Sequence, residues 1–126
     1  MSHTYSAAAL IAAHTAFRDL LDAETGAAAI RIRDSGGVLL ATATLADPSG
    51  AVNGTTGQLT LTVATQETNA PASGTAATAD IVDGAGVVHL TMEAIQGVSA
   101  QSGFCVLSDI NIVAAGSVDV VSAVIG

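Results

Sequence analysis

The sequence is poor in aromatic residues and poorer still in positive charge. Tyr5, Phe17 and Phe104 are its only aromatic rings, and it contains no Trp. A core without large rings has to be built from aliphatic side chains in thin layers, which favours strands packed on strands. Sugar-binding sites usually stack the sugar on an aromatic ring, so the scarcity of rings also argues against a glycan-binding module.

Lysine is absent, and the only basic residues are Arg18, Arg31 and Arg33. Against them stand 11 acidic residues, which give a formal net charge of −8. A nucleic-acid partner requires a basic patch that neutralises phosphates, and anionic membrane surfaces attract basic segments. We therefore expect neither nucleic acid nor a membrane surface as a partner.

Cysteine is nearly absent as well. Cys105 stands alone, so no disulfide can form within the chain, and we expect it to be a small buried hydrophobe. The N-terminus lacks the positive region of a signal peptide, and no apolar run is long enough to span a bilayer as a helix. We expect synthesis and folding in the cytoplasm.

Charged residues make up 11% of the chain, against roughly a quarter in ordinary soluble domains. The surface must therefore carry much Ala, Thr, Ser and Gly, with apolar patches between them. Such patches usually become interfaces, so we expect an oligomer or a part of a larger assembly.

Two stretches share one hairpin pattern. Residues 32–38 (IRDSGGV) lead on to Thr42, and residues 81–87 (IVDGAGV) lead on to Thr91, with Ile, Asp, Gly, Val and Thr at matching offsets. Alternation with a period of two predicts the flanking strands, and the glycines supply the positive φ that short turns need. The two stretches are either separate hairpins with the same turn chemistry or a duplicated unit whose copies pack face to face.

The N-terminal region predicts a helix from Ala7 to Glu24, capped by Thr4 or Ser6 and ended by Gly26. One apolar stripe is expected from Leu10, Ile11, His14, Phe17, Leu20 and Leu21. The alanines make the other faces small, which permits close approach to a sheet or a neighbouring copy. The acids near the C-terminus of the helix are disfavoured by its dipole.

The rest of the chain predicts short strands. They are expected at 28–33, 38–45, 58–65, 77–82, 87–92, 104–107, 109–113 and 117–124, with loops at 47–54, 66–73 and 94–103. We expect one domain over residues 1–126, with a leader and N-terminal helix at 1–26. Residues 27–126 would form an antiparallel β-sandwich, jelly-roll or immunoglobulin-like, of seven to eight short strands.

The residues that could bind a metal or take part in catalysis do not form any recognisable metal-binding or catalytic motif. His3, His14 and His89 have no second His or Cys at metal-ligand spacing, and we expect His14 to be a half-buried packing residue and His89 to face outward. No nucleophile elbow, phosphate loop or dinucleotide fingerprint is present. We expect no catalytic, cofactor-binding or metal-binding residues and no small-molecule substrate.

The acidic residues at turns have an ordinary structural explanation. Asp34, Asp83 and Asp109 sit where an Asp side chain usually accepts hydrogen bonds from the local backbone. We expect them to stabilise turns.

Three features together resemble a family of small virion proteins of tailed bacteriophages and prophages. They are the Ala-rich first helix, the repeated Ile-Asp-Gly-Val hairpin and the closing stretch 109–118 (DINIVAAGSV). Relatives carry a similar ending and a Leu-x-Asp-Pro loop like Leu45-Ala46-Asp47-Pro48. The resemblance covers most of the chain and implies a structural role in the virion without implying any site residue.

The resemblance leads us to expect a capsid decoration, or cement, protein. It would bind the major capsid protein on the outside of the head as a homodimer or homotrimer. We expect its contacts to include Arg18, Arg31 and Arg33, because they are the only cations, and the small face at Ala9, Ala13 and Ala16. The alternatives are a tail-tip or fibre-associated protein and a glycan-binding β-sandwich module.

Overall fold

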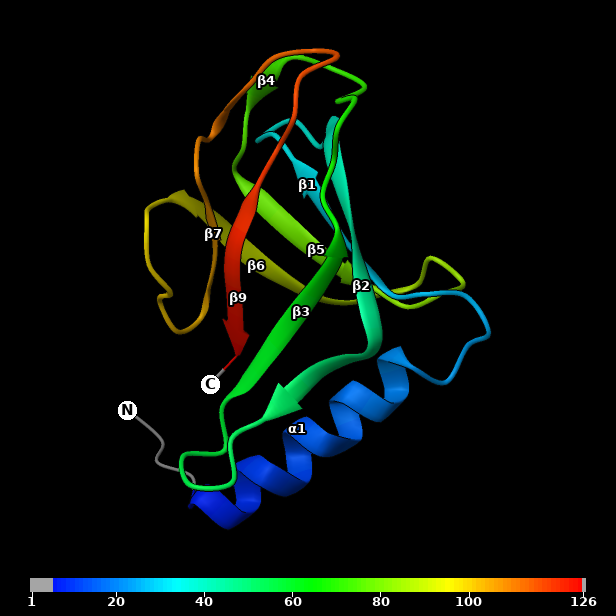
Figure 1. Cartoon of the computed structure of the whole chain (residues 1–126), viewed down its shortest axis with the longest axis vertical. Coiled ribbons are helices and arrows are strands. Elements are labelled where there is room, and N and C mark those ends of the chain that lie inside the picture. Colours follow the sequence, from blue (N-terminus) through cyan, green and yellow to red (C-terminus); the bar gives the residue numbers. More distant parts are fainter. Residues whose placement is uncertain (1–5, 126) are drawn as a thin grey trace.

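The computed structural model describes residues 6–125, and it is mainly β with one N-terminal helix (Figure 1). This confirms the coarse expectation from the sequence. The elements in chain order are α1 (Ala7–Leu21), β1 (Ala29–Arg33), β2 (Leu39–Val52), β3 (Leu59–Thr65), β4 (Gly74–Thr75), β5 (Thr78–Val82), β6 (Val88–Gln96), β7 (Phe104–Leu107), β8 (Asn111–Ile112) and β9 (Val120–Ile125). His3 and Thr4 lie outside the described residues.

Seven of these strands pair in a closed ring, in the order β1-β2-β3-β9-β7-β6-β5, and β4 and β8 form a separate two-stranded sheet. All pairs in the ring are antiparallel except β6 with β7, which are parallel from Glu93↔Phe104 to Gln96↔Leu107. The expected antiparallel sandwich of two sheets is therefore not confirmed. Period-two alternation marks the residues that face inward, but it is the same in a sandwich and in a barrel.

The interior is aliphatic, as the scarcity of rings predicts. Its fully buried members include Ile30, Ile32, Leu40, Leu59, Ile81 and Leu107. Ala28, Ile30 and Ile32 face inward together, as expected from the alternation in that stretch. Small residues such as Ala79 and Ala123 fill the space between the larger side chains.

The two repeated hairpins make the same turn, with equivalent hydrogen bonds in each. Asp34 Oδ1 accepts from the backbone N of Gly36 and of Val38, both at 2.9 Å. Asp83 Oδ1 accepts from the equivalent nitrogens of residues 85 and 87, at 2.9 and 3.0 Å. In both turns the third residue after the aspartate is a glycine with positive φ, Gly37 in one and Gly86 in the other. The copies lie side by side through the β1–β5 ladder, so the face-to-face packing considered for a duplicated unit is not what forms.

Strand β2 is longer than expected, because residues 47–52, predicted as loop, continue it past a cis peptide at Asp47–Pro48. Its register with β3 shifts between Leu45 and Gly50, after which Gly50–Val52 pairs with Leu61–Leu59. We call these paired ends and the loop 53–58 the arm. The arm and α1 lie together at one end of the molecule (Figure 1).

Smaller differences from expectation occur elsewhere. β6 continues through Gln96, so part of the expected 94–103 loop is strand, because residue 94 onward finds a parallel partner in β7. The expected strand at 109–113 reduces to β8, and β9 begins only at Val120. Asp109 Oδ1 accepts from the N of Asn111 at 2.8 Å, which confirms its expected turn role.

Candidate interaction surface

Helix α1 begins at an ordinary cap and ends early. Ser6 Oγ accepts from Ala9 N at 3.1 Å, which confirms one of the two expected caps. The helix ends at Leu21 with Asp22 as its C-cap, three residues before the expected end. Gly26 does not end the helix. Instead its backbone lies against that of Gly84 in the β5–β6 turn, where neither glycine has room for a side chain.

Two polar contacts hold the α1 segment on the arm and on the part of β2 just before it. His14 Nδ1 lies 2.6 Å from the carbonyl oxygen of Gly57, and because a carbonyl only accepts, Nδ1 carries the proton. Both carboxylate oxygens of Asp22 lie 3.1 Å from the backbone N of Ser49 and accept its hydrogen. Gly57 has φ of +79°, and a Cβ there would lie 2.5 Å from that of Leu10. His14 is half-buried, as expected.

The face of α1 that points away from the arm is apolar and exposed. Ala9, Ala13 and Ala16 are all exposed there, and Leu20 beside them is 47% exposed. Leu20, expected in one apolar stripe with Leu21, is instead exposed, because Leu21 fills the buried position in the last turn. The four residues are spaced four, three and four apart, which is the spacing of a coiled-coil seam. That spacing was the signal that sequence reasoning missed.

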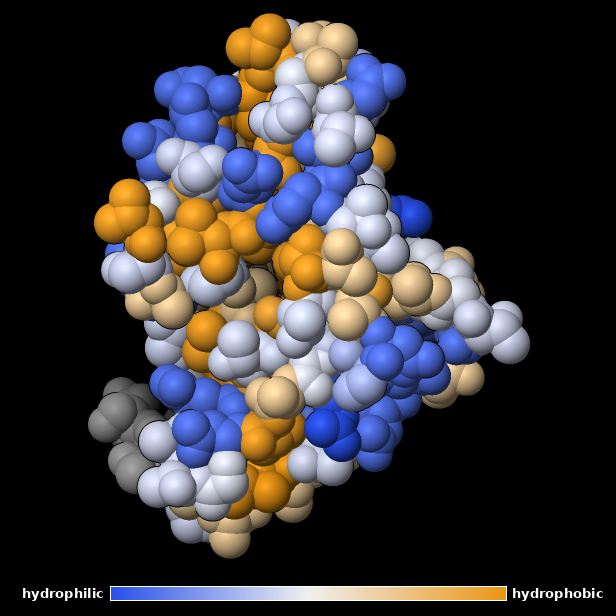
Figure 2. Space-filling view, viewed as in Figure 1, coloured by the Kyte–Doolittle hydropathy of each residue, from blue (hydrophilic) through white to orange (hydrophobic). Residues whose placement is uncertain are grey.

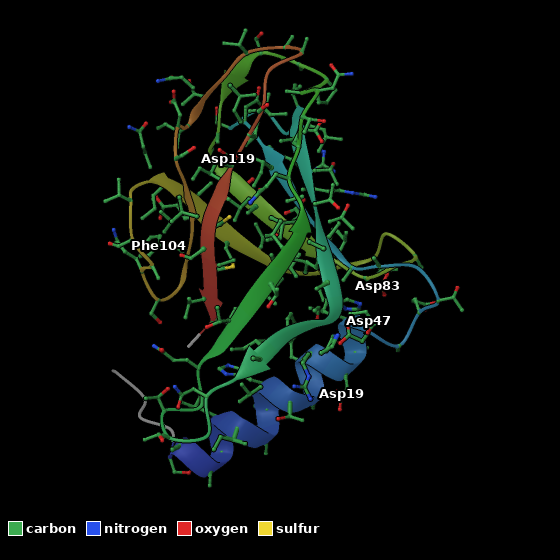
Figure 3. The ribbon with its side chains drawn as sticks, in the orientation of Figure 1. Asp19, Asp47, Asp83, Phe104 and Asp119 are labelled. Carbon is green, nitrogen blue, oxygen red and sulfur yellow. The ribbon has the colours of Figure 1, made fainter. Side chains whose placement is uncertain are left out.

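Two stretches of the described chain at this end contain no charged side chain. The stretches 7–17 in α1 and 48–66 in β2, the arm and β3 contain no Asp, Glu, Lys or Arg. Asp19 lies near the C-terminus of α1, and Asp47, Asp83 and Asp119 lie farther along the molecule (Figure 3). Because α1 packs on β2 and β3, the two uncharged stretches form one continuous region. We call it the uncharged end.

The three arginines do not join this surface as a single patch. Arg33 Nε lies 3.0 Å from Asp80 Oδ2, and its NH1 donates to the carbonyl of Gly37 at 3.1 Å. Arg31, also on β1, lies over the β5–β6 turn. Arg18, on α1, lies 3.5 Å from Asp19. Two of the expected contact cations are thus paired within the chain, and only Arg18 lies on the same helix as the alanines.

A further polar pair joins His89 and Asp83. His89 Nε2 lies 2.8 Å from Asp83 Oδ2, and the exposed fractions of the two side chains are 19% and 7%. His89 alternates along β6 with Leu90 and Met92, which face the core, so it lies on the outward face as expected, half-buried against the carboxylate of Asp83. The hydrogen bond from His89, with those from the backbone of residues 87 and 85, lowers the pKa of Asp83. Cys105 is fully buried, as expected, and burial raises its pKa to about 12, which leaves the thiol unreactive.

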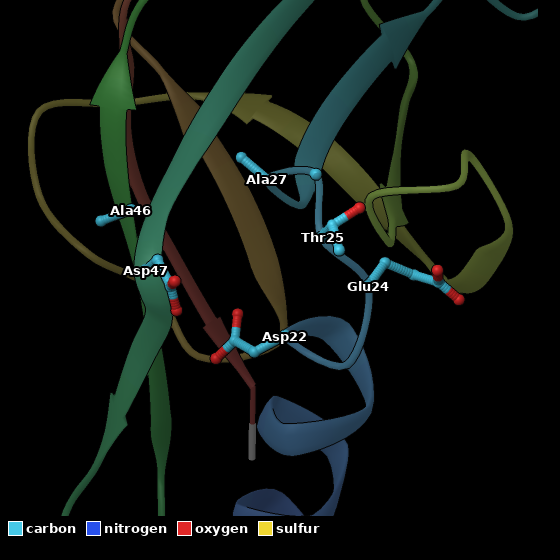
Figure 4. A pocket seen from close by; sticks show the side chains of 7 residues that line it. Asp22, Glu24, Thr25, Ala27, Ala46 and Asp47 are labelled. Carbon is cyan, nitrogen blue, oxygen red and sulfur yellow. The ribbon is translucent and has the colours of Figure 1, made fainter.

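A shallow pocket lies where α1 meets the bend of β2 (Figure 4). Its lining residues are Asp22, Glu24, Thr25, Gly26, Ala27, Ala46 and Asp47. Asp22 already accepts the Ser49 hydrogen bond, so its carboxylate has a structural role. Across residues 6–125, no three or more His, Cys, Asp or Glu side chains are grouped so that they could hold a metal ion.

Comparison of the chain with protein-family models, curated proteins and solved structures finds no match. Within the described part of the chain, no helix is long and apolar enough to cross a membrane. The interpretation of the surface therefore rests on its geometry, its charge and the sequence motifs.

Proposed function

We propose that this protein is a structural component of a phage virion that binds the outside of the capsid lattice as a small homo-oligomer and stabilises the head. The observation that carries the proposal is the uncharged end together with the exposed Leu20 and alanines of α1, on a protein of net charge −8. Exposed apolar surface of this kind usually forms contacts with other proteins. The virion assignment rests on the resemblance of the hairpin and the closing stretch to phage virion proteins.

Further apolar contact points lie at loops away from the uncharged end. Val98 in the β6–β7 loop is 96% exposed, and Val113 between β8 and β9 is 68% exposed. Figure 2 shows apolar side chains in a belt across the middle of one face and again at the end where α1 lies. A protein with several separated contact points suits a clamp, since contacts made to several capsid subunits at once add through multivalency.

The decisive test is the copy number of this protein relative to the major capsid protein in purified particles, measured by quantitative mass spectrometry. A cement protein repeats with the lattice, so the proposal predicts a ratio near one or a simple fraction of one. A ratio of about one per hundred would contradict the proposal and place the protein at the tail.

The arginines offer a second test with an internal control. Replacing Arg18, Arg31 and Arg33 by Ala should reduce incorporation into particles if these cations contact acidic capsid groups. Asp80→Ala is the matched control, because it breaks the same Arg33–Asp80 pair from the other side but leaves the cation in place. Equal incorporation of all these variants would remove the arginines from the interface.

A further inference from the structure

We propose that Asn53, the first residue of the loop 53–58 in the arm, is a site of spontaneous deamidation in the folded protein. The backbone nitrogen of Gly54 attacks the side-chain carbonyl carbon of Asn53, and aspartate or isoaspartate results. The reaction needs only the chain itself and water. It is followed on the purified protein without capsids, so its outcome does not depend on the proposed function.

The reaction is balanced by the groups present at this site. The nitrogen of Gly54 forms a bond to Cγ of Asn53, and the bond between Cγ and Nδ2 breaks. The departing nitrogen takes the proton that the attacking amide gives up, so ammonia leaves and a cyclic imide remains. Water then adds to one of the two carbonyl carbons of the imide and opens the ring. One opening gives aspartate, and the other gives isoaspartate, whose main chain runs through the side-chain carbon.

The attacking nitrogen is accessible. Asn53 and Gly54 are both exposed, and a Cβ on Gly54 would meet nothing within 4 Å, so no other group packs over this peptide. Among residues 6–125, no backbone carbonyl accepts the N–H of Gly54. Glycine also leaves the main chain free to rotate toward Cγ, which a side chain would hinder. The nucleophile is therefore neither covered nor engaged elsewhere.

The other two asparagines of the chain are placed differently. Asn69 precedes Ala70, whose nitrogen already donates to a backbone carbonyl at 2.9 Å. Asn111 precedes Ile112, which lies in the β4–β8 sheet. In both cases the residue that would supply the attacking nitrogen is buried and carries a side chain. We therefore expect Asn53 to react first.

Two backbone donors point at the oxygen that becomes negative during the attack. Oδ1 of Asn53 accepts from the N of Thr55 at 2.7 Å and from the N of Thr56 at 2.9 Å. When the nitrogen of Gly54 attacks, negative charge develops on this same oxygen, and fixed N–H donors stabilise such charge. The turn that orders the loop thus also lowers the barrier to its modification.

The modification changes the arm in two ways. Either product places a carboxylate in the stretch 48–66, which has none. Isoaspartate also reroutes the main chain after residue 53, where the carbonyl of Asn53 accepts from the N of Gly57 at 2.9 Å. The carbonyl of Gly57 is in turn the group that His14 binds. Isoaspartate should therefore loosen α1 from the arm, whereas aspartate keeps the main chain and an oxygen for both donors.

Incubation of the purified protein at neutral pH tests the proposal. Peptide mass spectrometry at successive times measures the conversion of amide to acid at each asparagine, and an isoaspartyl methyltransferase counts the isoaspartate. We expect Asn53 to convert at least about tenfold faster than Asn69 or Asn111. Conversion of either of these at the rate of Asn53, or an Asn53 that stays unconverted, would overturn the proposal.

Variants of the two following residues test the parts of the site. Gly54→Ala adds a side chain beside the attacking nitrogen, where it meets no neighbour, and should slow the conversion by about tenfold. Thr55→Pro removes one of the two donors to Oδ1 and should slow it by about threefold or more. Thr55→Ala is the matched control, because it keeps that donor and should leave the rate unchanged.

Circular dichroism shows whether each variant keeps the fold. Unchanged conversion in Gly54→Ala would overturn the attack by this nitrogen. Equal rates in the two Thr55 variants would overturn the contribution of the backbone donors.

Discussion

Arg31 and Asp80 lie directly opposite each other in the β1–β5 ladder, and each lies three residues before the aspartate that begins its own turn. They are therefore equivalent positions of the two hairpins. On either side of them Ile30 faces Ile81 and Ile32 faces Ala79. The two hairpins are thus related by an approximate two-fold axis that passes between Arg31 and Asp80.

The equivalence of the two turns allows a matched comparison. Asp34→Asn keeps an oxygen that can accept the two turn hydrogen bonds, so we expect it to lower the free energy of unfolding by less than about 0.5 kcal/mol. Asp83→Asn keeps the same two bonds but loses the carboxylate oxygen that accepts from His89, and we expect a clearly larger loss. Urea denaturation at pH 7 measures both. Equal losses would show that the His89 pair contributes nothing to stability.

Low pH should remove the contribution of Asp83 to the free energy of unfolding. Its pKa is lower in the folded protein than its ordinary value of 3.8, chiefly because His89 donates to it. The folded state therefore favours the charged carboxylate, and this stabilisation is complete above the unfolded pKa and is lost as the pH falls through the folded pKa. The difference in unfolding free energy between the native protein and Asp83→Asn should shrink below pH 4. A difference that stays constant from pH 7 to pH 2.5 would contradict this account.

Gly57 should be intolerant of a side chain. Ala at this position would hold positive φ and press its Cβ against Leu10, so we expect Gly57→Ala to lower the free energy of unfolding by about 1–3 kcal/mol. Gly54→Ala is the control, since a Cβ at Gly54, in the same loop, meets nothing within 4 Å. Thermal denaturation followed by circular dichroism compares the two. If both variants melt together, α1 is not held by the approach of Leu10 to Gly57.

The side chain of Gln66 links β3 to β9 beyond the two backbone pairs that join these strands. β3 and β9 share only the pairs Leu59↔Ile125 and Thr60↔Val124. Farther along, Gln66 Oε1 accepts from Val120 N at 2.9 Å and its Nε2 donates to Val120 O at 3.2 Å. Gln66→Ala removes both of these hydrogen bonds from the backbone of buried Val120, and we expect a loss of about 1–3 kcal/mol in the free energy of unfolding.

Hydrogen exchange locates the effect of Gln66→Ala. The amide of Val120 should exchange faster in this variant, whereas Gln101→Ala, in the exposed β6–β7 loop, should change neither stability nor that amide. Unchanged protection of Val120 would mean that the seam between β3 and β9 closes without Gln66.

Features set by neighbouring residues were predicted well from the sequence. The short apolar run at 104–107 predicts β7 with its observed bounds, and the turn aspartates bind the backbone nitrogens expected of them. The alanine face of the helix was also identified, and Ala9, Ala13 and Ala16 are exposed.

Features set by distant partners were not predicted. Residues 94–96 are strand because β7 pairs with them in parallel, and the polar stretch 47–50 is strand because β3 and Asp22 supply partners for its backbone. Neither partner is adjacent in the chain. For the same reason the closure of the sheet into a ring could not be predicted from the sequence. The inward-facing residues alternate in the same way in a barrel and in a sandwich.

The position of β9 in the ring has a consequence during synthesis. β9 is the last strand in chain order, yet it lies between β3 and β7. Until residues 120–125 have left the ribosome, β3 and β7 each present an unpaired edge, and so many copies made at once expose such edges together. An edge of this kind pairs readily with another chain, so β9 of one nascent molecule could close the ring of its neighbour. Rapid insertion of the six residues of β9 would therefore decide how much of the protein is made as separate molecules and how much as exchanged ones.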